Sequence, residues 1–181
     1  MSLLTNTNSL ALWQEVIHRA EDSCAIMLKK ELEAYLASLL MRYTSHTDLL
    51  KHAMAIKFLK SLQAHQYERH AALQNVGDEC LLVTGLFPNA VDKYHVKIHY
   101  FVDLGQAAYA NISQQSNDIF QLLANHFVLL MDILQSIRQY SKEYPDLMPL
   151  AAYEQWSSIG SQRARRVLEQ YTGKNTILIK I

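Results

Sequence analysis

The sequence has little glycine and proline, the two residues that most often interrupt helices and shape turns. Only 5 of its 181 residues are glycine and 3 are proline, whereas the two together average about 12% of a globular chain. A β-sandwich or barrel needs a turn roughly every 8–12 residues, and such turns are rich in these residues. The composition therefore excludes an all-β fold and favours an all-α one.

Cysteine and net charge are also scarce. Cys24 and Cys80 form no CxxC motif and are too few for a disulfide framework. The 17 basic and 17 acidic residues balance, which leaves no positive surplus of the kind that nucleic-acid binding requires. The most apolar stretch, residues 119–137, contains several polar side chains and is too polar to span a bilayer. Because the chain also begins without the features of a signal peptide, we expect a cytoplasmic protein with no membrane or nucleic-acid partner.

The first 76 residues contain no glycine or proline and show helical periodicity. Apolar residues recur at spacings of three and four, which predicts one helix from Ser9 to about Tyr43, after a flexible lead-in over residues 1–8. A short polar break separates it from a second helix, predicted from Asp48 to about Asn75. Two long helices with a short link predict an antiparallel helical hairpin.

The rest of the chain predicts further helices. Residues 94–104 fit either a strand or a helix. We favour the helix because Asp103 suits an early helical position ahead of Gln106–Ile112. Residues 118–142 predict a long helix that is apolar on most sides, as expected for a central element. Two shorter helices follow, around residues 150–157 and 161–171, and Gly160 separates them.

The last residues, TILIKI, have the composition of a short strand. A lone strand leaves its backbone groups unpaired. It would pair with the same strand of a second copy in a homodimer, or else form a frayed tail or an apolar segment against a helix. We therefore expect residues 1–181 to form a single all-α domain. It would be a multi-helix bundle with a long N-terminal hairpin and a minor strand or tail over residues 174–181.

One histidine pattern suggests a metal site. His95, His99 and Asp103 follow one another at intervals of four residues. On a helix they would share one face, a geometry that can bind a transition metal. The alternative is that the two histidines are partly buried and hydrogen-bonded within the fold.

Two further patterns carry less specific signals. Glu15 and His18 form a single E-x-x-H, whereas carboxylate-bridged di-iron bundles use two such pairs, so we interpret it as a surface coincidence. Arg163, Arg165 and Arg166 are the only basic cluster. On a helix Arg163 and Arg166 share a side and could grip a phosphate or a partner's carboxylates, or they could simply stay solvated.

Asp132 is unusual because it lies in a largely apolar helix. Such a carboxylate needs a hydrogen-bonding partner or a shifted pKa, and we expect a structural partner. The sequence contains no nucleophile elbow, Walker loop, dinucleotide fingerprint or H-E-x-x-H motif. It therefore assigns no catalytic residue and names no cofactor.

The middle of the chain carries motifs with glycine, proline and aromatic residues at fixed offsets. They are GDECLL at 77–82, GLFP at 85–88, YFVDLG at 100–105 and AY at 108–109. In these motifs the chain resembles a family of uncharacterised bacterial helical proteins. The resemblance implies kinship with bacterial cytoplasmic proteins and implies no activity. A weaker similarity is Trp156 with Gly160-Ser161 before the final helix.

The same motifs have a physical meaning. Gly85 and Gly105 lie in otherwise helical stretches, where each costs about 1 kcal/mol relative to alanine. They fit either a close helix crossing or a place where a bound group needs room. The polar side chains near them, and our candidates for a ligand-binding pocket, are Asp78, Tyr100, Asp103 and Tyr109.

We expect from these features a helical interaction or regulatory module, a homodimer without catalytic activity. The alternative is a ligand- or metal-binding helical protein, or an enzyme, with a small-molecule pocket around residues 77–109.

Overall fold

The computed structural model describes residues 2–44, 54–63, 65–87, 96–112, 118–140 and 147–172. Every regular element in these ranges is a helix, which confirms the expected all-α bundle. The helices are α1 (Ser2–Cys24), α2 (Lys30–Thr44), α3 (Met54–Gln63), α4 (Gln66–Leu86), α6 (Ile98–Ile112), α7 (Ile119–Asn125), α8 (Phe127–Gln139), α9 (Pro149–Ile159) and α10 (Gln162–Thr172). The strand or tail expected over residues 174–181 lies outside the described residues.

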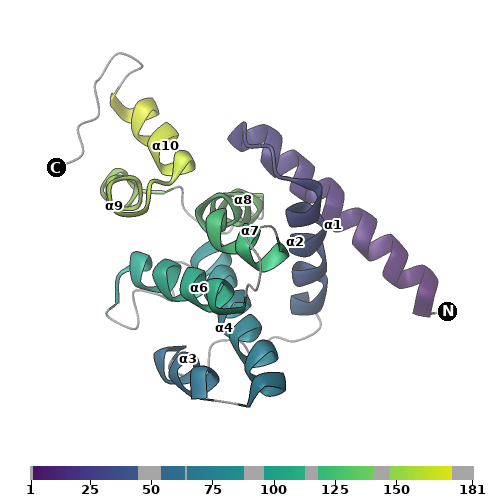
Figure 1. The fold of residues 1–181 in the computed structure, drawn as a ribbon. Coiled ribbons are helices and arrows are strands. Elements are labelled where there is room, and N and C mark those ends of the chain that lie inside the picture. Colours follow the sequence, from purple (N-terminus) through teal and green to yellow (C-terminus); the bar gives the residue numbers. More distant parts are fainter. Residues whose placement is uncertain are drawn as a thin grey trace.

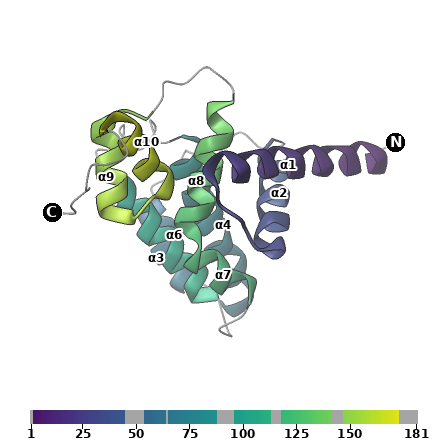
Figure 2. The same cartoon turned by 90° about the horizontal axis from the view of Figure 1, so that it is seen from above.

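Helix α4 lies at the centre of the packing. It contacts α3, α6 and α8, and α8 in turn contacts α1. Figure 1 shows α1 and α2 on one side of this centre and the pair α9 and α10 on the other. Seen from above in Figure 2, the N-terminal end of α1 extends beyond the other helices.

The core is a single large cluster with a small satellite. Helix α8 contributes much of the large cluster, as the apolar sequence of this helix predicts. Its fully buried residues there are Phe127, Leu130, Met131, Ile133 and Leu134. Beside it, Ala152, Ala164 and Leu168 form a separate small cluster between α9 and α10. The last two helices therefore pack mainly on each other and are joined to the rest through fewer contacts.

The prediction of a single helix from Ser9 to about Tyr43 is wrong. Helix α1 begins at Ser2, so the lead-in is not an irregular segment, and it ends at Cys24. Ala25 then takes a φ of 42°, in the left-handed region that ends helices and that glycine normally occupies.

A local hydrogen bond between a side chain and the backbone stabilises this unexpected corner. The backbone N–H of Leu28 donates to Oε1 of Glu21 over 2.6 Å. Helix α2 then runs beside α1. The hairpin of the N-terminal region is thus formed by α1 and α2, and it is shorter than the sequence predicted.

The second predicted helix also differs from the observed one. Where one helix was expected up to Asn75, α3 ends at Gln63 and α4 runs from Gln66 to Leu86. Gly77 does not end α4 but lies within it, where the helix packs closely against Tyr109 of α6.

The predicted long helix over residues 118–142 is bent. Helices α7 and α8 meet at His126 at an angle of 73°. No single helix in the described ranges is long and apolar enough to cross a membrane. The bent pair α7–α8 reaches that length and apolar character when its two helices are counted together, which is a statement about length and composition alone.

The other local predictions are confirmed. Residues 98–104 belong to α6 and are helical, and α9 and α10 are separated by Gly160. Gly160 has a φ of 75° and caps α9 in the left-handed conformation. Ser161 caps α10, because its Oγ accepts the backbone N–H of Ala164 over 3.0 Å.

Candidate functional site

The glycines of the 77–109 region mark tight helix crossings. A Cβ atom added at Gly77, Gly85 or Gly105 would lie 2.4–2.5 Å from a side-chain atom of a neighbouring helix. Those side chains are Tyr109, Leu134 and Phe127, respectively. Of the two interpretations that the sequence left open, the structure supports close packing at these glycines and leaves no room there for a bound group.

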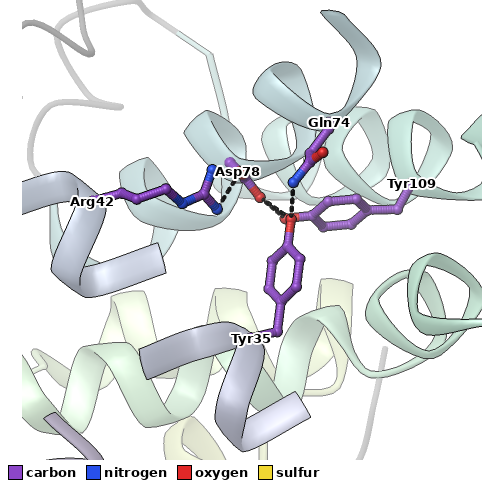
Figure 3. Close-up of polar contacts among 5 residues, drawn as sticks. All are labelled: Tyr35, Arg42, Gln74, Asp78 and Tyr109. Atoms are coloured by element: carbon purple, nitrogen blue, oxygen red, sulfur yellow. Dashed lines mark hydrogen bonds and ion pairs between the residues drawn. The ribbon is translucent and has the colours of Figure 1, made fainter. Parts of the chain in front are cut away.

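Asp78 lies beside one of these crossings, in a network that joins α2, α4 and α6 (Figure 3). The hydroxyls of Tyr35 and Tyr109 each donate to its Oδ1 over 2.7 Å. Arg42 donates to Oδ2 over 3.1 Å, and Gln74 donates to the Tyr35 hydroxyl over 3.1 Å. Both carboxylate oxygens are therefore occupied by partners from within the protein.

The electrostatics of the network follow from its burial. Burial raises the pKa of Asp78, although the hydrogen bonds from Tyr35 and Tyr109 and the charge of Arg42 oppose the shift. Burial and the neighbouring carboxylate raise the pKa values of both tyrosines. Both phenols thus remain hydrogen-bond donors at neutral pH, and the network acts as a structural link between three helices.

The structure brings together only two of the four residues proposed for a ligand pocket. Asp78 and Tyr109 are buried and hydrogen-bonded to each other. Tyr100 lies at the surface against Phe101, with ring centroids 5.5 Å apart, and Asp103 is exposed. Neither contributes to the Asp78 network, because α6 turns them toward solvent.

The proposed metal trio is only partly described. His99 is half-buried and Asp103 is exposed, and both lie on α6. His95 lies outside the described residues, so this trio stays a prediction. The E-x-x-H pair does not form a site: Glu15 pairs with Arg19, and His18 makes other contacts.

A cleft of about 480 Å³ opens where the end of α1, the end of α8 and α10 meet. Its polar lining includes the hydroxyls of Ser23, Ser136 and Tyr140 and the side chains of Arg163 and Arg166. The Ser23 and Ser136 hydroxyl oxygens are 2.7 Å apart, and the Tyr140 hydroxyl donates to Ser23 over 3.4 Å. Among the described residues that line the cleft, none is acidic.

Asp132 fixes the start of α10 beside this cleft. Its Oδ1 accepts the Ser161 hydroxyl over 2.6 Å, and its Oδ2 accepts the backbone N–H groups of Gln162 and Arg163 over 2.9 and 3.1 Å. Burial raises the pKa of Asp132, and these bonds oppose the shift. The prediction of a structural partner for this carboxylate is confirmed, with α10 as that partner.

The three arginines of α10 have different environments. Arg163 is buried and donates to Oε1 of Gln135 over 3.1 Å. Arg165 is exposed and pairs with Glu169. Arg166 is half-buried in the cleft wall and forms no ion pair with a described residue. Arg163 and Arg166 lie three residues apart on one side of the helix, as the sequence predicted.

Sequence reasoning found the arginine pair and missed the rest of the cleft. Ser23, Ser136 and Tyr140 come from two other helices and carry no motif. The absence of acidic residues applies to the cleft lining alone, since Glu169 lies in the same helix as the arginines. The lining could therefore be recognised only once the fold brought α1, α8 and α10 together.

Comparisons with protein-family models, with curated proteins and with solved structures found no match for this chain. The function proposed below therefore rests on the geometry of the site.

Proposed function

We propose that this protein is a non-catalytic regulatory module that binds a small anionic ligand in the cleft between α1, α8 and α10. The ligand class is a phosphate or phosphate monoester. The observation that carries the proposal is a cleft whose described lining holds two guanidinium groups and no carboxylate.

The chemistry of the lining supports this ligand class. A guanidinium offers paired N–H donors that match the oxygens of a phosphate, and such charge-assisted bonds are stronger than neutral ones. The hydroxyls of Ser23, Ser136 and Tyr140 add polar groups to the lining, although they also hydrogen-bond to one another and Ser23 donates to the carbonyl of Ala20. The volume of about 480 Å³ falls within the range of about 300–1,000 Å³ that small-molecule sites occupy.

The position of the cleft supports a regulatory role. Its walls come from three helices, and α10 is tied to α8 by the Asp132 bonds while it packs mainly on α9. A ligand that bridges the arginines of α10 and the hydroxyls of α1 and α8 would stabilise one arrangement of these elements. Ligand binding would thereby change the surface that the module offers to a partner.

Calorimetric titrations of the protein with inorganic phosphate and with phenyl phosphate test the proposal. We expect phenyl phosphate to bind, its neutral counterpart phenol not to bind, and Arg166→Gln to weaken binding at least tenfold. Arg165→Gln is the matched control, because Arg165 is exposed and pairs with Glu169. Equal effects of the two substitutions, or no binding by the natural chain, would contradict the proposal.

We also propose the homodimer, the cytoplasmic location and the bacterial kinship expected from the sequence. Static light scattering of the full chain and of a chain truncated after Gly173 tests the dimer, since the truncation removes the predicted strand. If the truncated chain has the same number of subunits as the full chain, the strand is excluded as the dimer contact.

A further inference from the structure

We propose that His18, Glu21 and Glu33 bind a divalent transition-metal ion at the corner between α1 and α2. One ligand atom from each side chain lies within 4.8 Å of the other two. Nε2 of His18 is 2.9 Å from Oε1 of Glu33, and Nδ1 is 3.1 Å from Oε2 of Glu21. Bonds of about 2.0–2.1 Å to a tetrahedral zinc ion place ligand atoms about 3.4 Å apart. Because one ion binds only one of the two ring nitrogens, the imidazole or the carboxylate at the other nitrogen must move before all three ligands surround the ion.

The burial of the two acids distinguishes this cluster from ordinary surface charges. The side chains of Glu21 and Glu33 are only 10% and 15% exposed. Carboxylates that converge in a partly desolvated place repel each other and need a compensating cation. A protonated His18 would still leave one excess negative charge. A divalent ion with a neutral imidazole balances both carboxylates.

The nearest arginine on α1 is engaged elsewhere. Arg19 forms an exposed ion pair with Glu15, one turn before it. These two groups lie on the solvent side of the helix, with side chains 70% and 59% exposed. The charge of Arg19 is thus already matched by Glu15.

The corner holds one of the acids in place for an ion. Oε1 of Glu21 accepts the backbone N–H of Leu28 over 2.6 Å, which leaves Oε2 directed toward His18. Metal-binding carboxylates are commonly oriented by such an outer hydrogen bond. The turn after Ala25 brings Glu33 of α2 back beside α1, so the site exists only in the folded corner.

The donor set indicates the class of ion. One imidazole nitrogen and two carboxylate oxygens suit Zn²⁺, Fe²⁺, Co²⁺ or Mn²⁺, whereas Mg²⁺ and Ca²⁺ prefer oxygen ligands alone. We choose Zn²⁺ as the expected ion because it accepts three protein ligands with one open position. His18 is 60% exposed, so an ion can enter from solvent and a water molecule can complete its coordination.

Calorimetric titration of the tag-free, chelator-washed full chain with Zn²⁺ tests the site. We expect one ion per chain, and a loss of affinity of at least tenfold in both His18→Ala and Glu33→Gln. The matched control is Glu15→Gln, which removes an exposed carboxylate one helical turn before His18 and should leave Zn²⁺ binding unchanged. Binding of Co²⁺ provides a second measurement, since its visible absorption should change when the imidazole ligand is lost.

Two outcomes would overturn the site. One is the absence of stoichiometric Zn²⁺ binding by the natural chain, which would leave His18 as a hydrogen-bonded link between two carboxylates. The other is binding that survives both His18→Ala and Glu33→Gln. Circular dichroism of the metal-free variants verifies that they are folded, and His18→Ala is the safer variant because His18 is largely exposed. Phosphate titrations in metal-free buffer keep this result independent of the proposed anion cleft.

Discussion

Two buried carboxylates, Asp78 and Asp132, show how the same group can serve different ends in one bundle. Asp78 is surrounded by side chains: two tyrosine hydroxyls and one arginine occupy both of its oxygens. Asp132 instead binds the first backbone N–H groups of α10 and the capping hydroxyl of Ser161. The first network closes on itself, whereas the second directs a helix and its arginines toward a cleft.

The difference teaches where a binding site can arise in a helical protein of this size. A closed network such as that of Asp78 satisfies its polar groups inside the fold and leaves nothing for a ligand. A carboxylate that holds a helix start leaves the side chains of that helix available. In this chain Arg166 is such a side chain.

The largest expected effect is the loss of Asp132. Asp132→Ala would leave the Ser161 hydroxyl and two backbone N–H groups without their acceptor, next to the buried Arg163. We expect the free energy of unfolding to fall by about 3 kcal/mol, because each stranded buried donor is costly. Urea denaturation measures this loss. Glu169→Ala, which removes the acid of the solvent-accessible ion pair with Arg165, should change stability by less than about 0.5 kcal/mol; a similar loss in both would contradict the capping role.

A second substitution, at Gly77, tests the packing beside the Asp78 network. Gly77→Ala places a Cβ 2.5 Å from the Tyr109 ring, which is held by its bond to Asp78. Overpacking of this kind costs about 1–3 kcal/mol, and we expect about 2 kcal/mol in thermal or urea unfolding. Gly160→Ala, whose Cβ would meet nothing within 4 Å, should cost only about 1 kcal/mol from its left-handed backbone. A harmless Gly77→Ala would show that the crossing is looser than described.

Replacement by asparagine compares the two carboxylates directly. At Asp132 the new amide group would face one or more of the N–H donors that the carboxylate now accepts, and we expect a loss of about 2 kcal/mol. At Asp78 the amide oxygen still accepts the two tyrosines, and half-exposed Arg42 can turn to solvent. We therefore expect Asp78→Asn to change stability by less than about 1 kcal/mol at pH 7. Equal losses at the two sites, measured by urea unfolding, would remove the distinction between them.

The pH dependence of stability tests the electrostatics of the Asp78 network, although burial raises the pKa of both carboxyl groups. Burial raises the pKa of Asp78 in the folded protein, so the folded state keeps this proton at pH values where the unfolded chain has lost it. The contribution of the protonated group is thus complete below the ordinary carboxyl pKa and is lost as pH rises through the raised one. We expect the Asp78→Asn variant to lose less stability than the natural chain as pH rises from the ordinary carboxyl pKa to the raised pKa of Asp78. Parallel curves for the two proteins would contradict the raised pKa.

The smallest expected effect on stability is that of Arg166. Arg166→Gln should alter the free energy of unfolding by less than about 0.5 kcal/mol, because Arg166 forms no ion pair with a described residue. The same variant should lose phosphate binding, and this combination separates a ligand contact from a structural one. A large loss of stability in urea would instead assign Arg166 to the fold.

The sequence predicted the fold class and several elements because those depend on local patterns. Apolar periodicity identified the buried helix α8, and Gly160 marked the boundary between α9 and α10. It also identified Asp132 as a carboxylate in need of a partner, and Arg163 and Arg166 as a pair on one side of α10.

What the sequence could not predict depends on specific contacts that apolar periodicity does not encode. The corner at Ala25 has no glycine or proline to signal it and is fixed by a hydrogen bond from Leu28 to Glu21. The cleft takes its lining from three helices, and the approach of Glu33 to His18 exists only because of the corner. Tyr100 and Asp103 were placed with Asp78 and Tyr109 on motif spacing alone, which does not say which side of α6 faces inward.

The left-handed Ala25 means that the segment from 9 to 43 has two competing shapes. Its local sequence favours one straight rod, whereas the Leu28–Glu21 hydrogen bond and the packing of α1 on α8 hold the bend. Whatever loosens α1 from α8 in the finished protein would therefore tend to straighten this arm.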